Sequence, residues 1–132
     1  MGSLNVFLEK VTNLSDQDLL GKSDPYVVFE LEQDNMFLDK DFGRKQSSKK
    51  KDDCSPVYNE SFTFTDLPGL KNLVLNVKIM EDDIVSDDKI GSCRIKLDKL
   101  KLDHGPVRDA WVVDNNLFSK DAKIFLKLTW NV

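Results

Sequence analysis

The clearest strand in the sequence is LVLNVKI, residues 73–79. Its odd-numbered positions are all apolar, whereas Asn76 and Lys78 on the alternate row are polar. A period of two is typical of a β-strand that has one face on a hydrophobic core and the other toward water. The segment therefore predicts a half-buried strand in an antiparallel sheet.

The same alternation recurs along most of the chain, and sustained helical spacing is almost absent. Further strands are predicted around residues 4–8, 26–31, 58–64, 89–97, 110–113 and 124–130, with a weaker third strand between 36 and 48. Turn sequences at 67–69 and 104–106 separate them, and only 98–102 suggest a turn or two of helix. We expect one all-β domain over residues 1–132, an eight-stranded antiparallel Greek-key β-sandwich.

Composition excludes several classes of protein. A chain of 132 residues that is 40% apolar can fill one core. Its apolar runs are far shorter than the roughly 20 residues of a membrane-spanning helix. Residues 1–4 lack the pattern of a secretion signal, and Val6 does not fit the myristoylation motif. Because Cys54 and Cys93 lie far apart without metal-ligand spacing, we expect free thiols and a cytoplasmic protein.

Acidic residues gather at two predicted strand ends, in a chain of formal net charge −4. Asp18 and Asp24 bracket a glycine turn before the second strand. The fifth strand runs into a second group, formed by Glu81, Asp82, Asp83, Asp87 and Asp88. Continued alternation places Glu81 and Asp83 on the same side as the core-facing Ile79.

Convergence of these carboxylates predicts a cation site. Each like-charged pair about 4 Å apart repels by roughly 4 kcal/mol at an effective dielectric constant near 20. Many oxygen ligands on loops suit calcium better than magnesium, and the lack of nearby cysteine or paired histidine disfavours zinc. The alternative is that these aspartates only form turns, a role in which aspartate is common.

Three segments carry a resemblance to a known family. The run DLLGKSDPYV, residues 18–27, resembles the signature of the C2 domain family, whose members are calcium-dependent phospholipid-binding modules. The run SPVYNESFTF, residues 55–64, is similar to the family's fourth-strand motif, with Ser55 where asparagine is usual. Residues 79–91 resemble its third calcium loop. The order of the segments resembles the type II topology, in which both termini lie away from the calcium loops.

This resemblance implies a ligand set and two Ca²⁺ ions. Carried over by position, the ligands are Asp18, Asp24, Glu81, Asp83 and Asp88. Aspartate is usual at position 81 and the loop is one residue short, so Asp82 and Asp87 are alternative ligands.

Other side chains predict contact with an anionic phospholipid membrane. Leu19, Leu20, Ile84 and Val85 are apolar residues set among the aspartates, and Lys49, Lys50 and Lys51 precede the second loop. We expect the apolar four to insert into lipid, although folding back onto the sandwich is an alternative. Removing the five implied ligands from a net charge of −4 leaves +1. The docking end therefore repels an anionic membrane until calcium neutralises it, which predicts recruitment as calcium rises.

Other functions remain as alternatives or are disfavoured. A calcium-independent C2-like module that binds other proteins stays open. His104 lies beside a turn without a partner implied by spacing, so no catalysis is expected. The lysine run has no interleaved aromatic residues and the chain is acidic, so no nucleic acid is expected as a partner.

Overall fold

The computed structural model describes residues 1–14, 24–51, 53–82, 87–114 and 122–132. Within these residues the chain forms eight strands and two short 3-10 helices: β1 (Gly2–Thr12), β2 (Asp24–Gln33), β3 (Lys40–Gln46), β4 (Val57–Leu67), β5 (Leu73–Asp82), β6 (Asp88–Lys96), η1 (Leu97–Lys99), η2 (Leu102–His104), β7 (Val107–Val112) and β8 (Lys123–Asn131). The all-β prediction is confirmed.

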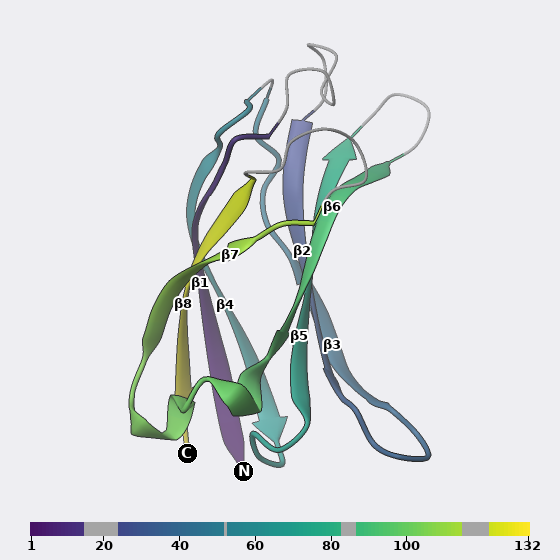
Figure 1. Cartoon of the computed structure of the whole chain (residues 1–132), viewed down its shortest axis with the longest axis vertical. Coiled ribbons are helices and arrows are strands. Elements are labelled where there is room, and N and C mark those ends of the chain that lie inside the picture. Colours follow the sequence, from purple (N-terminus) through teal and green to yellow (C-terminus); the bar gives the residue numbers. More distant parts are fainter. Residues whose placement is uncertain (15–23, 52, 83–86, 115–121) are drawn as a thin grey trace.

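The strands form two antiparallel sheets that pack face to face. One sheet has the order β4-β1-β8-β7 and the other β3-β2-β5-β6. Figure 1 shows both termini at one end of the sandwich, whereas β2 begins and β5 ends at the other. This arrangement confirms the predicted antiparallel β-sandwich and places the termini as the type II resemblance implies.

The core fills the space between the two sheets. The inward row of β5, formed by Leu73, Leu75, Val77 and Ile79, is fully buried at 0% exposure, as its alternation predicts. Phe29 of β2 meets Phe62 of β4 from the other sheet, with ring centroids 5.4 Å apart. Burying each large apolar side chain contributes about 1.5–3 kcal/mol, so these inward rows hold the sheets together.

The third strand is an edge strand and lies within the range 36–48 that the sequence predicts. Residues 36–38 precede it, and their three apolar side chains are 79–94% exposed. The pairing of β2 with β3 shifts register between Leu31 and Glu32, and opposite this shift Gly43 has φ +117°. Its N–H donates to Oδ1 of Asp41 at 2.8 Å. This irregularity breaks the alternation, which explains the weak signal.

The connection from β3 to β4 is hydrogen-bonded to the start of β2. The Ser47 N–H donates to the Val27 carbonyl at 2.8 Å, and the Val27 N–H donates to Ser47 Oγ at 2.8 Å. The Lys50 N–H donates to the Pro25 carbonyl at 3.0 Å, and the Tyr58 hydroxyl donates to the same oxygen at 2.8 Å. The lysine run therefore lies beside the first residues of β2.

We expect Ser47→Ala to lower the free energy of unfolding by about 1–3 kcal/mol in urea denaturation, because the buried Val27 N–H loses its acceptor. Ser61→Ala is the control, since Ser61 is exposed on β4. Its effect should stay within about 0.5 kcal/mol. Equal effects for the two variants would contradict the role given to Ser47.

Candidate functional site

Strand pairing gathers acidic residues at one end of the second sheet. Asp24 pairs with Asp82 across β2 and β5, and Glu81 pairs with Asp88 across β5 and β6. Asp87 directly precedes β6. These five residues are members of the acidic groups seen in the sequence, and they lie at the end of the sandwich opposite the chain termini (Figure 1).

Glu81 lies on the inward side of this end. It follows Ile79 on the buried row of β5, pairs with Pro25 of β2 and is 8% exposed. The alternation of β5 therefore extends to Glu81 as the sequence predicts. A carboxylate so little exposed is costly unless other groups compensate its charge. The inward side of this end thus has a strong requirement for positive or hydrogen-bonding partners.

The outward side of the same end carries a network of side chains. Nζ of Lys49 lies 3.2 Å from Oδ2 of Asp82 and 5.3 Å from the centroid of the Tyr26 ring. The Tyr26 hydroxyl donates a hydrogen bond to Oδ2 of Asp87. Residues on both flanks of segment 83–86 are thus bound by side chains from β2 and from the β3–β4 connection.

The remaining predicted site residues have different outcomes. Asp18, Leu19, Leu20, Asp83, Ile84 and Val85 lie outside the described residues. Nζ of Lys50 lies 5.6 Å from the Tyr58 ring centroid, and Lys51 is exposed. In the part of the chain that is described, no three carboxylates of this end bring their oxygens within 4.8 Å of one another. The expected ligand set includes Asp18 and Asp83, so the described residues form only part of it.

A second acidic group, which the sequence reading missed, lies at the opposite end of β2. Carboxylate oxygens of Glu32, Asp34 and Asp39 lie within 4.8 Å of one another. Arg94 of β6 pairs with Asp34 and lies 3.9 Å from Glu32, and the Asn76 amide donates to Glu32 at 2.6 Å. The spacing of Glu32 and Asp34 on one row was a possible signal. Because Arg94 already neutralises part of this charge, the group carries no metal assignment.

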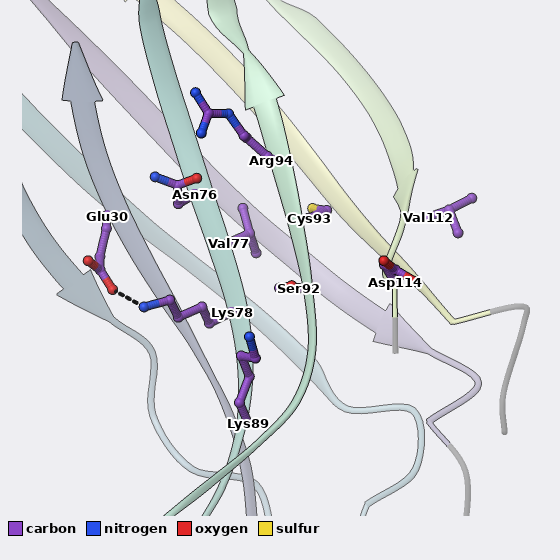
Figure 2. Close-up of a pocket in the computed structure, with 10 residues that line it drawn as sticks. All are labelled: Glu30, Asn76, Val77, Lys78, Lys89, Ser92, Cys93, Arg94, Val112 and Asp114. Carbon is purple, nitrogen blue, oxygen red and sulfur yellow. Dashed lines mark hydrogen bonds and ion pairs between the residues drawn. The ribbon is translucent and has the colours of Figure 1, made fainter. Parts of the chain in front are cut away.

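A pocket of about 500 Å³ is lined by residues of β2, β5 and β6 together with Val112 and Asp114 (Figure 2). Within it, Nζ of Lys78 and Oε1 of Glu30 form an ion pair at 2.8 Å. Cys93 also lines the pocket, and burial raises the pKa of its thiol to about 12. A thiol that stays protonated near neutral pH is a poor nucleophile. His104 is exposed in η2, 3.7 Å from the Asp103 carboxylate.

The fold and the acidic end define an antiparallel β-sandwich module with carboxylates gathered at one end. A family model described as C2 domain matches residues 2–113. Synaptotagmin-C of Diplobatis ommata is 34% identical over 113 residues, which cover 83% of this chain and 19% of that protein. Synaptotagmin-5 of Arabidopsis thaliana is 28% identical over 129 residues, 98% of this chain and 21% of that protein. The chain belongs to the C2 domain family.

Solved structures share the fold. A C2 domain of plant Extended Synaptotagmin 1 aligns with a TM-score of 0.80 at 21% identity, covering 98% of this chain and 94% of that one. A calcium-bound pair of C2 domains from Extended-Synaptotagmin 2 aligns with a TM-score of 0.75 at 18% identity, covering 99% and 42%. The chain spans about a fifth of the length of the synaptotagmins it matches. Among the described residues, no helix has the length and apolar character to cross a membrane.

The two tyrosines of the chain should titrate abnormally. Burial, followed by the hydrogen bond to Asp87, raises the pKa of Tyr26 to about 12, and burial also raises the pKa of Tyr58. Unfolded tyrosine titrates near pH 10. Absorbance near 295 nm should therefore stay low at pH 10.5 in the folded protein and rise with a midpoint near 10 in urea.

The raised pKa values of the two tyrosines also determine how the stability of the fold changes with pH. Both tyrosines hold their protons more tightly in the folded state, so their stabilising contribution is complete below pH 10. For Tyr26 it is lost as the pH rises from about 10 through about 12. A native titration midpoint near 10 for both side chains would contradict their burial.

Proposed function

We propose that this chain binds Ca²⁺ at its acidic end and, once loaded, docks that end on anionic phospholipid membranes. The observation that carries the proposal is the strand register, which places Asp24, Glu81 and Asp88 together at the end of the sheet. Of the other two implied ligands, Asp83 directly follows β5 in sequence and Asp18 precedes Asp24 by six residues. The family relationship and the calcium-bound state of one structural neighbour support the same function.

The chemistry of the donor set fits calcium. Every candidate ligand is a carboxylate, and calcium accepts six to eight oxygens in irregular geometry. Asp24 and Asp88 would contribute from β2 and β6, Glu81 from the inward side of β5, and Asp82 or Asp87 would complete the set if the short loop excludes another ligand. Bound calcium would add positive charge to this end and offer open coordination positions for lipid phosphate. The implied number of ions is two.

Side chains around the acidic end would then make the membrane contact. Leu19, Leu20, Ile84 and Val85 are the apolar candidates for insertion, and each half-inserted side chain would contribute about 1 kcal/mol. Lys50 and Lys51 lie on the same side of the molecule as the start of β2 and would add roughly 1 kcal/mol each near an anionic leaflet. The proposal makes the chain a peripheral, cytoplasmic binding module that carries out no reaction and moves to membranes as calcium rises.

A calcium-independent module that binds other proteins is the second candidate. One observation favours it: Lys49 already neutralises Asp82 without an ion. Sedimentation with phosphatidylserine-containing vesicles separates the two candidates. Calcium-dependent capture that a chelator reverses supports the first, and capture unchanged by chelator, or absent in both conditions, supports the second.

Asp24→Asn should weaken calcium binding about tenfold or more in calorimetric titration. Mutation of a residue that only hydrogen-bonds to a metal ligand typically lowers metal affinity about 10–100-fold, and loss of a direct ligand should cost at least as much. Asp103→Asn is the matched control, since it makes the same charge change at an exposed position in η2. Its calcium affinity should equal that of the wild type. No heat of calcium binding in the wild type would overturn the proposed function.

The double variant Leu20→Ser and Ile84→Ser should weaken calcium-dependent vesicle binding about tenfold or more, because two half-inserted apolar side chains are lost. Its calcium affinity without lipid should be unchanged. Val112→Ser is the control, since Val112 is an apolar residue that is 58% exposed on β7. Unchanged vesicle affinity in the double variant would show that these residues pack on the sandwich.

A further inference from the structure

Lys49 is held against the acidic end by its neighbours in the chain. The backbone on either side is fixed to β2, by Ser47 N–H to the Val27 carbonyl at 2.8 Å and by Lys50 N–H to the Pro25 carbonyl at 3.0 Å. Between these anchors the Lys49 side chain lies over the ring of Tyr26 and reaches Asp82. Its contact with Asp82 is therefore preorganised by the backbone.

This contact offsets a repulsion that the fold creates. Asp24 and Asp82 face each other directly across β2 and β5, and like charges in that position destabilise a sheet. Among the ion pairs between described residues, the one that reaches this end is Lys49 with Asp82. Lys50, the next residue, instead lies over the ring of Tyr58. The two lysines therefore have different surroundings although they are adjacent.

We propose that Lys49 is the built-in counter-ion of the acidic end in the ion-free protein, and that it competes with calcium and so sets the calcium affinity. The inference rests on the proposed function, in which Asp24 is a ligand and its pairing partner Asp82 is an alternative ligand. An ion at this end gains less from Asp82 while that carboxylate is neutralised, and it is also repelled by the Lys49 ammonium group. Lys49 thereby acquires a role that Lys50 and Lys51 lack.

Two variants that remove the same charge from adjacent positions test this role. Lys49→Met and Lys50→Met each lose one positive charge and keep an unbranched side chain. In calorimetric titration with CaCl₂, Lys49→Met should bind calcium about three- to tenfold more tightly than the wild type, the effect expected of one partly exposed charge near a divalent ion. Lys50→Met should change the affinity less than about twofold. Lys49→Arg keeps the charge and should bind calcium as the wild type does.

A measurement without calcium separates the counter-ion role from a general change of charge. In chelator, Lys49→Met should unfold about 2 °C below Lys50→Met, because Asp82 then faces Asp24 without its lysine. Saturating calcium should remove this difference. Raising NaCl from about 0.05 M to about 0.5 M should shrink the gap in calcium affinity between the two variants, since salt screens partly exposed charges.

The outcomes distinguish this inference from the function on which it rests. Normal calcium binding by the wild type, together with equal affinities for Lys49→Met and Lys50→Met, overturns the inference and leaves the proposed function standing. Absence of calcium binding in the wild type overturns both. The inference is supported if Lys49→Met binds calcium more tightly than the wild type, Lys49→Arg does not, and Lys49→Met is less stable than Lys50→Met without calcium.

Discussion

The pairing of β2 with β5 is the constraint on which the rest of the structure depends. The two strands stay in register without a shift from Asp24 opposite Asp82 to Gln33 opposite Leu73. This register aligns the inward rows that build the core, and the same alignment brings acidic strand ends side by side. A slip of one residue would turn the buried row of β5 outward. Core packing thus fixes the position of the acidic end.

The repulsion among the carboxylates of the acidic end is partly offset within the chain. Lys49 and Tyr26 bind the carboxylates that flank residues 83–86 from the outer face of the sheet. On the inward side Glu81 is nearly buried, and the proposed ions would add positive charge to the whole acidic end. The end can therefore fold before an ion arrives, and its affinity for the ion depends on how strongly the internal partners hold their carboxylates.

Closeness of carboxylates alone does not define a metal site in this molecule. Glu32, Asp34 and Asp39 approach one another more tightly than the described carboxylates of the proposed calcium end. However, Arg94 and Asn76 already bind two of them, so that group is compensated within the protein. The difference lies in what surrounds each group, which depends on strands distant in sequence.

The sequence by itself determined the sandwich, its central strands and the inward direction of Glu81, because alternation with a period of two records which face of a strand meets the core. It also placed aspartates at the strand ends and predicted the family. It did not locate the start of β3, whose edge position and bulge leave no clear alternation. Nor did it separate Lys49 from Lys50, or reveal Arg94 beside Glu32. Those contacts join residues from different strands, and only the tertiary structure decides them, since a linear pattern specifies the face on which a side chain lies but not which side chain it meets there.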